Sequence, residues 1–158
     1  MANPPGSDIS VRKATRADLD TVIQFNLALA WESEGRSLDL ARLRTGVEAV
    51  FDGDGRGFYL VAEMDGRVVG QLLITHEWSD WRNAFFWWIQ SVYVSAEYRR
   101  QGIYRTLHSY VLAEAKRQGD VCGLRLYVDR DNSVAQRVYS GLDMQQARYD
   151  MFEIDFVL

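Results

Sequence analysis

Two apolar runs joined by a tight turn constrain the fold of this chain most strongly. The stretch FYLVAEMDGRVVGQLLITHEW, residues 58–78, places apolar residues on both sides of Asp65-Gly66. An Asp-Gly pair favours the two-residue turns of β-hairpins, which need positive φ. After the loop SDWRN, residues 84–94 (AFFWWIQSVYV) contain the longest uninterrupted apolar run and predict a buried strand. These segments predict antiparallel pairing in the middle of a sheet.

The other segments predict helices and strands on both sides of this centre. Thr15 and Asp18 have the spacing of a capping box, ahead of apolar residues at helical intervals. The predicted strands lie at residues 9–13, 124–128 and 149–156, and the predicted helices at about residues 19–35, 37–55, 103–118 and 132–140. The order β-α-α-β-β-β-α-β-α-β implies right-handed crossovers with some parallel pairing late in the chain. A mixed sheet with helices on both faces follows.

Length and composition indicate one folded domain, residues 9–158, after a flexible segment at residues 1–8. Hydrophobic residues make up 47% and aromatic residues 13% of the 158 residues, which excludes a disordered chain. The net charge of -4 excludes a broad basic field, so no nucleic-acid partner is expected. The apolar runs are too short to span a bilayer, and the first residues lack the pattern of a signal peptide. We therefore expect a cytoplasmic protein without a membrane partner.

The cysteine and histidine content indicates neither a disulfide framework nor a metal site. Cys122 is the single cysteine, and its apolar surroundings predict a buried structural thiol. His76 and His108 do not have metal-ligand spacing to each other or to Cys122, so no metal is expected.

The stretch YRRQGIYRTLH, residues 98–108, predicts a helix with an unusual beginning. Ile103 and Leu107 have helical spacing, whereas Gly102 permits backbone angles that other residues resist. The first turn of a helix presents N–H groups and a partial positive charge. With the arginines nearby, that turn makes an anion site, and a phosphate is the usual occupant. A basic turn that is simply solvated is the alternative from this segment alone.

Two sets of residues at defined spacing carry a family resemblance. After the strand end SVYV, Arg99, Gly102 and Tyr104 match the pattern Arg/Gln, two residues, Gly, one residue, Gly/Ala, except that Tyr104 replaces a small residue. After the later strand come Asn132, Ala135 and Tyr139. The sequence thereby resembles the GNAT superfamily of N-acetyltransferases over roughly residues 9–156. A second departure is Asp143-Met144, where members usually have Gly-Phe or Gly-Met.

The resemblance implies an α/β fold, with a central, mostly antiparallel sheet, a splayed pair of parallel strands and helices on both faces. Acetyl-CoA would lie between the SVYV and LRLYV strands, with its pantetheine arm on Val92 and Val94 and its pyrophosphate on the amides of residues 100–105. The implied cofactor-binding residues are Val92, Tyr93, Val94, Arg99, Arg100, Gln101, Gly102, Ile103, Tyr104, Arg105, Asn132, Ala135 and Tyr139.

The implied reaction is acetyl transfer to an amine, and it needs a proton donor and a route for the amine's proton. The resemblance places Tyr139 near the CoA sulfur as the donor, with helix packing as the alternative role. Several members carry a Glu where this chain has Gln90, which cannot take a proton. The open choices for the base are Glu32, Glu34, Glu77 or a chain of waters; for each acid, simple solvation is the alternative. The expected acceptor-binding residues are Trp31, Glu32, Glu34, Trp88 and Gln90.

Dense aromatic residues adjoin the central strand. Alternation sends Trp87 and Trp88 to opposite faces, so one is expected in the core and the other in the acceptor pocket or a subunit contact. A homodimer is a further expectation from this aromatic content.

The sequence therefore predicts an acetyl-CoA-dependent N-acetyltransferase acting on a primary amine, of a small molecule rather than of a protein. A CoA-binding regulatory module without catalysis is the alternative, because of Gln90, Tyr104 and Asp143. A nucleotide-phosphate binder of another α/β type is disfavoured, because the chain has neither GxxxxGK[ST] nor GxGxxG.

Overall fold

The structure, a computed structural model, describes residues 8–158. The flexible segment expected at residues 1–8 lies outside the described part except for its last residue. The chain divides into two compact units, one ending at Tyr127 and one running from Val128 to Leu158. Between residues 8 and 158, every helix is too short or too polar to span a lipid bilayer.

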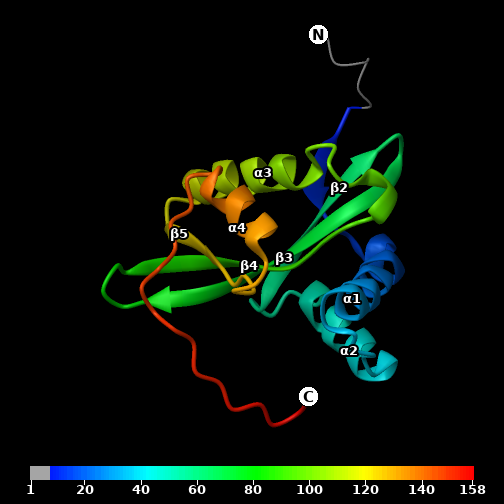
Figure 1. The fold of residues 1–158 in the computed structure, drawn as a ribbon, viewed down its shortest axis with the longest axis horizontal. Coiled ribbons are helices and arrows are strands. Elements are labelled where there is room, and N and C mark those ends of the chain that lie inside the picture. Colours follow the sequence, from blue (N-terminus) through cyan, green and yellow to red (C-terminus); the bar gives the residue numbers. More distant parts are fainter. Residues whose placement is uncertain (1–7) are drawn as a thin grey trace. The chain divides into compact units, whose positions relative to one another are not determined.

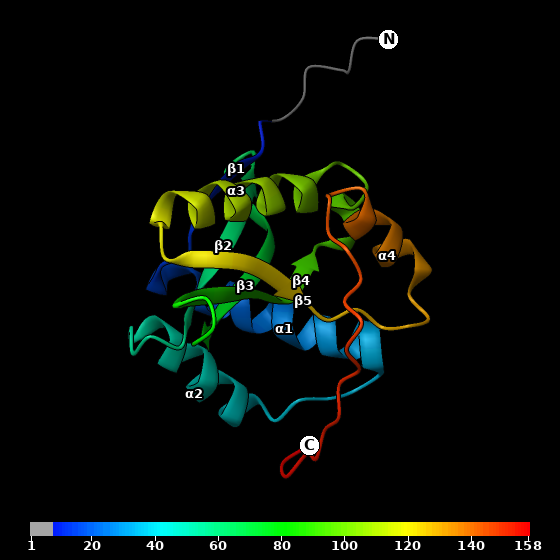
Figure 2. The same cartoon turned by 90° about the vertical axis from the view of Figure 1, so that its left-hand side faces the viewer.

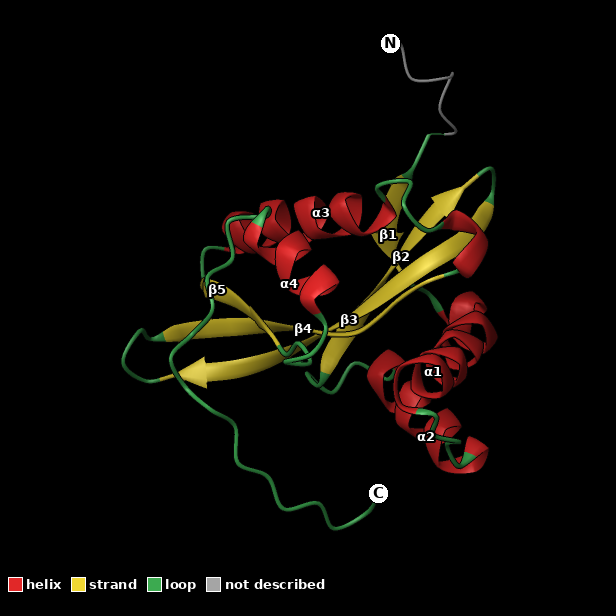
Figure 3. Cartoon of the chain, viewed as in Figure 1, coloured by secondary structure: helices red, strands yellow, loops and turns green. Residues whose placement is uncertain are grey.

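The first unit contains a five-stranded sheet in the order β1-β2-β3-β4-β5 (Figure 3). Neighbouring strands are antiparallel up to β4, and β4 pairs with β5 in parallel. This confirms the predicted hairpin and the mixed sheet. Strand β5 begins three residues earlier than the strand predicted at residues 124–128. The strands are β1 Ser10–Lys13, β2 Gly57–Met64, β3 Arg67–Ser79, β4 Ala84–Val94 and β5 Val121–Leu126.

Helices cover both faces of this sheet, as Figures 1 and 2 show. They are α1 Leu19–Glu34, α2 Leu40–Phe51 and α3 Ile103–Gln118. One stripe of α3 packs on one face, against Leu72, Ile74, Trp87 and other sheet residues; the stripe is Ile103, Leu107, Val111 and Ala115. On the opposite face, α1 and α2 enclose a second core, made of Val22, Ile23, Val47 and Tyr59. Both cores are apolar stripes buried against a pleated sheet, which is the main source of stability for such layers.

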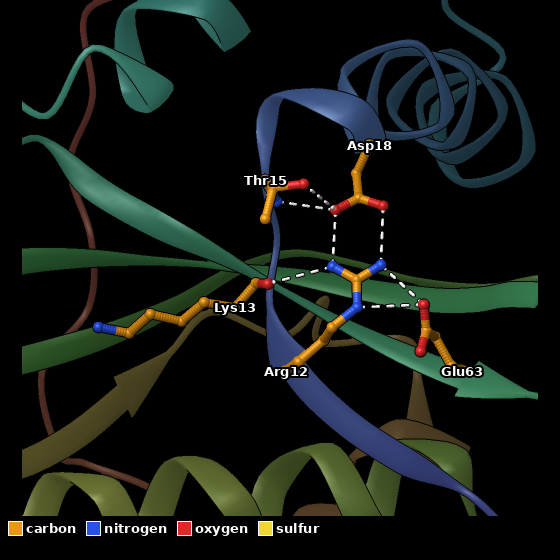
Figure 4. A network of polar contacts seen from close by, with 5 residues as sticks. All are labelled: Arg12, Lys13, Thr15, Asp18 and Glu63. Carbon is orange, nitrogen blue, oxygen red and sulfur yellow. Dashed lines mark hydrogen bonds and ion pairs between the residues drawn. The ribbon is translucent and has the colours of Figure 1, made fainter.

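An arginine network ties the beginning of the chain to the sheet (Figure 4). Arg12 of β1 makes two hydrogen bonds to the Asp18 carboxylate, at 2.8 and 3.0 Å, and donates to Glu63 of β2 at 2.7 Å. Asp18 also accepts from the backbone N–H of Thr15 at 2.7 Å, which completes the predicted capping box. The Arg12 guanidinium lowers the pKa of Asp18. The network therefore fixes the entry into α1.

The second unit contains one helix, α4 Ser133–Ser140, among its described residues. The Asn132 side chain caps it by accepting from the N–H of Ala135 at 3.0 Å. The strand predicted at residues 149–156 is wrong, because this segment has no regular structure. Its large apolar side chains are exposed, 95% for Phe152 and 91% for Phe156. Alternation predicts a strand only where a partner strand supplies hydrogen bonds, and none of the described strands does so here.

The prediction of a buried Cys122 is also wrong, because this thiol is exposed. Phe85 pairs with Val121 and Phe86 with Gly123, so Cys122 is an extra residue in β5. Such a bulge residue lies outside the regular alternation of the sheet. The apolar run around Cys122 could not reveal this local shift of register.

Candidate functional site

The two parallel strands of the sheet separate part-way along β4. Pairing with β5 ends at Ile89, opposite Leu126, whereas β4 continues to Val94 and pairs there only with β3. Among the described residues, no strand lies hydrogen-bonded to the other edge of Gln90–Val94. An unpaired edge of this kind is a template for an extended ligand with amide groups.

A β-bulge accompanies this separation. Gln90 pairs with Leu73 and Tyr93 with Gln71, so Ser91 and Val92 together face a single residue of β3. Ser91 has a φ of +49°, a region that residues other than glycine rarely occupy. A bulge bends its strand and re-aims its backbone groups. The bulge therefore marks the point where β4 turns away from β5.

The turn after β4 presents backbone N–H groups at the start of α3. Arg100 and Gly102 both have positive φ, +63° and +84°. The first intrahelical bond runs from Thr106 N to Gly102 O at 3.0 Å, so the N–H groups of residues 103–105 point out of the helix start. A Cβ added at Gly102 would meet no atom within 4 Å. Backbone conformation, not crowding, therefore favours glycine here.

The three arginines at this turn have different surroundings. Arg99 donates from Nε to the carbonyl of Val94 at 2.9 Å, pairs with Glu32, and lies 5.5 Å from the ring centre of Tyr93. Arg100 and Arg105 are exposed, and neither has an ion pair within residues 8–158. Arg99 is therefore committed to holding the turn, while Arg100 and Arg105 remain available to an anionic ligand.

Glu32, at the end of α1, is the partner of Arg99 in this ion pair. Its carboxylate accepts hydrogen bonds from Arg99 and, at 2.9 Å, from the Tyr93 hydroxyl. Both lower the pKa of Glu32, Arg99 more than Tyr93. Burial, reinforced by Glu32, raises the pKa of Tyr93. Two hydrogen bonds stabilise the charged form of this carboxylate, and a carboxylate with a lowered pKa is a weak base. The geometry therefore favours a positioning role for Glu32.

The other residues expected near α1 lie in open surroundings. Glu34 pairs with Arg36 at 3.5 Å, and its side chain is 60% exposed. Trp31 is 63% exposed. Among the described residues, neither side chain makes a hydrogen bond, ion pair or ring contact with β4.

The residues of β4 on the α1 side make a compact polar and aromatic group. Trp87 is buried in the core beneath α3, whereas Trp88 faces the other way, which confirms the predicted alternation. The Trp88 indole donates to Glu77 at 3.0 Å, and Arg125 pairs with Glu77 at 2.6 Å. The Trp88 and Tyr127 ring centres are 4.4 Å apart. We call Glu77, Trp88, Arg125 and Tyr127 the aromatic-acidic group.

This group stands immediately beside the point where the strands separate. Trp88 pairs with Arg125, and the next pair, Ile89 with Leu126, is the last. Gln90 follows on the same face as Trp88 and donates to the Thr75 hydroxyl. The sequence prediction did not include Arg125, Tyr127 or Thr75. The alternation in LRLYV could have placed Arg125 and Tyr127 on one face, but their register against β4 required the structure.

The second unit contains the predicted motif Asn132, Ala135 and Tyr139. Asn132 is the cap of α4, and Ala135 supplies the N–H that it binds. Burial raises the pKa of Tyr139, so its phenol keeps its proton at neutral pH. Tyr139 therefore has the chemistry of a proton donor.

Comparison with known families gives this arrangement its context. A family model for GNAT acetyltransferases matches residues 24–144, more than half of the chain and parts of both units. The chain belongs to the GNAT family of acetyltransferases. This confirms the predicted resemblance, and it makes the protein an acyltransferase of the GNAT type. The extent of a single domain, residues 9–158, stays a prediction.

Solved structures agree with this assignment. A possible acetyltransferase from Clostridium difficile 630 is 42% identical, covers 95% of this GNAT protein and 99% of its own chain, and has a TM-score of 0.87. An aminoglycoside N-acetyltransferase in complex with CoA is 15% identical at a TM-score of 0.74, with 98% and 99% covered. A ribosomal-protein-alanine N-acetyltransferase from Brucella melitensis biovar Abortus 2308 is 17% identical at 0.75, with 95% and 100% covered. The last two show the fold alone.

Proposed function

We propose that this GNAT protein transfers an acetyl group from acetyl-CoA to a primary amine of a small molecule. One observation carries the proposal: β4 leaves β5 at Gln90 and leads directly to the open helix start at Gly102. An extended arm can pair with the free edge of β4 while a phosphate binds the N–H groups at the start of α3. Support also comes from a distant neighbour of the same fold that was crystallised with CoA.

The residues present fit this cofactor. The backbone of Val92 and Val94 offers hydrogen-bonding groups to an amide-containing arm, and the N–H groups of residues 103–105 offer donors to a pyrophosphate. Arg100 and Arg105 add positive charge, because Arg99 already pairs with Glu32. Acetyl-CoA, when bound, supplies an acetyl group activated as a thioester.

The aromatic-acidic group is our proposed site for the acceptor amine. Trp88 and Tyr127 provide ring faces that suit an ammonium group, and the Glu77 carboxylate, which Arg125 also binds, lies beside them. Trp88 lies one residue pair before the strands separate, so an amine held there would be next to the edge assigned to the cofactor. Glu77 is shared between Arg125 and Trp88, which favours a role in binding rather than in accepting a proton.

The remaining roles concern protons. We assign Tyr139 as the donor to the leaving thiolate, on the strength of its motif and its retained phenol proton. Gln90 cannot accept a proton, although its amide can hold a water, so we assign removal of the amine's proton to water. General acid catalysis of this kind contributes roughly 10²–10⁴-fold. Tyr139→Phe should therefore lower kcat by about that factor and change the dissociation constant of acetyl-CoA far less.

Calorimetric titration with acetyl-CoA is the deciding experiment. Gly102→Glu places a negative side chain in front of the α3 amides and should abolish binding. Gly119→Glu is the matched control, because Gly119 has a similar φ of +78°, is equally open, and caps the opposite end of the same helix. Binding that survives Gly102→Glu, or absence of binding to the wild type, would overturn the cofactor site.

A thiol-release screen over amines then tests the reaction. It should include aminoglycosides, polyamines, amino acids and peptides with free N-termini. Turnover with a small amine, with a raised KM for that amine in Glu77→Gln and an unchanged KM for acetyl-CoA, supports the proposal. Binding of acetyl-CoA without turnover of any amine would point to the non-catalytic module instead.

A further inference from the structure

A cavity of about 230 Å³ lies on the α3 face of the sheet, at the end away from Gly102. Its walls are mostly aromatic: the Phe58 and Trp87 ring centres are 5.2 Å apart, and His76 lies 5.8 Å from Phe85. The lining residues are Lys13, Phe58, His76, Phe85, Trp87, Gln118 and Asp120. We call this the aromatic pocket.

The aromatic pocket exists because α3 is shorter than the strands beneath it. The helix ends at Gln118, and Gly119 in the left-handed conformation closes it. The far ends of β3 and β4 therefore extend beyond the helix. Sixteen helical residues span about 24 Å, so the pocket is distant from the helix start assigned to the cofactor. It is a separate feature of the molecule.

An exposed tryptophan stands beside this pocket on the same protomer. Trp81, in the turn between β3 and β4, is 90% exposed. In Figure 1 this hairpin projects beyond the end of α3. Trp78 on the adjoining strand is 52% exposed and packs edge-on against Phe85, a wall of the pocket. Tryptophan is enriched in protein–protein interfaces relative to the rest of the surface, so Trp81 is suited to a contact with another molecule.

We propose that the protein forms a two-fold dimer in which Trp81 of each copy occupies the aromatic pocket of the other. In a two-fold dimer, if the hairpin of one copy meets the pocket of its partner, the reverse contact forms as well. The tip and the pocket lie next to each other on one protomer, as this symmetry needs. The cavity is below the roughly 300–1,000 Å³ typical of small-molecule sites, so it suits one side chain.

Charged residues adjoin both the tip and the pocket. Asp80 and Arg82 flank Trp81, while Lys13 and Asp120 lie at the pocket. Within residues 8–158, the ion pairs include neither Lys13 nor Asp120. Lys13 instead holds its ammonium 4.8 Å from the centre of the Phe58 ring. An inserted Trp81 would give this ammonium a second ring, and Asp80 would give it a counter-charge.

Sedimentation equilibrium over a wide range of protein concentration tests the proposal. The wild type should dimerise, and Trp81→Ala should raise the dimer dissociation constant at least about thirtyfold, as loss of a central interface tryptophan does. Because Trp81 is so exposed, this change should leave the fold intact, as circular dichroism can verify. Trp31→Ala, at another exposed tryptophan, is the matched control and should leave dimerisation unchanged.

A charge exchange supplies the second arm. Asp80→Lys and Lys13→Asp should each weaken the dimer, and the variant carrying both should recover much of the loss. A monomeric wild type would overturn the proposal. Binding of free indole in the pocket of such a monomer would not rescue it. A dimer that persists in Trp81→Ala and in both single charge variants would overturn it as well.

Discussion

Two arginines in this protein hold carboxylates on neighbouring elements, and their surroundings differ. Arg12 joins β1 to β2 and to the entry of α1, and the Asp18 side chain that it binds is only 8% exposed. Arg99 joins the turn before α3 to the end of α1, where the Glu32 side chain is 41% exposed. The first network lies within the fold, and the second lies beside the open edge of β4.

An arginine–carboxylate pair thus has a different role in each of the two networks. Removing one partner of a buried pair leaves an uncompensated charge, which is strongly destabilising. An exposed pair contributes about 0–1 kcal/mol, because water competes for both groups. We infer that Arg12 maintains the fold, whereas Arg99 mainly orients the turn whose amides face the proposed cofactor site.

Removing Arg12 should have the largest effect. Arg12→Met leaves the buried Asp18 carboxylate without its guanidinium and, because the Arg12 side chain itself is 38% exposed, should lower the free energy of unfolding by about 1–3 kcal/mol. Arg99→Met should lower it by less than about 1 kcal/mol. Urea unfolding followed by tryptophan fluorescence measures both. Equal losses in the two variants would remove the distinction between the networks.

Acid should weaken the Arg12 network. Arg12, followed by the Thr15 backbone, lowers the pKa of Asp18 below the ordinary value of 3.8. Such a group contributes stability that is present above its unfolded pKa and is lost as pH falls through the lower folded pKa. Melting temperatures between pH 7 and pH 2 should therefore fall below about pH 4 in the wild type. Asp18→Asn should start lower and show a shallower fall; an identical acid profile would contradict this.

Local patterns in the sequence predicted much of the fold because each rested on neighbouring residues. The Asp65-Gly66 turn, the strand at residues 84–94 and the Thr15–Asp18 capping box all depend on contacts within a few positions. The same holds for the opposite faces of Trp87 and Trp88. These features need no knowledge of distant segments.

Features that depend on distant partners could not be predicted in this way. The strand expected at residues 149–156 required a pairing edge, and the burial of Cys122 required a register that the β5 bulge changes. Glu32 was predicted as a base or an acceptor ligand, but its pairing with Arg99 spans 67 positions in the chain. Spacing alone does not show which charges meet across such a separation.

The Arg99 network should affect cofactor use more than stability. Arg99→Met frees the turn, and a displacement of about 1 Å at such a site can cost up to 10²-fold in rate. We expect KM for acetyl-CoA to rise roughly tenfold, with the amine KM unchanged. Arg36→Met is the control, since Arg36 also pairs with a glutamate at the end of α1. An unchanged acetyl-CoA KM in Arg99→Met would show that the turn is held without this pair.

Beneath the Arg99 network lies a buried amide that distinguishes it further from the Arg12 network. Gln71 pairs with Tyr93 in the β3–β4 register and is fully buried, and neither amide atom has a hydrogen-bond partner within the described residues.

A buried polar group left unpaired costs about 1–3 kcal/mol, whereas methionine fills a similar volume without that cost. Gln71→Met should therefore raise the free energy of unfolding by about 1 kcal/mol. Gln101→Met, at an exposed glutamine of the turn, should change stability little. If Gln71→Met instead destabilises the protein, the amide has a partner such as a buried water, and the bulge of β4 is as fully satisfied as the network around Arg12.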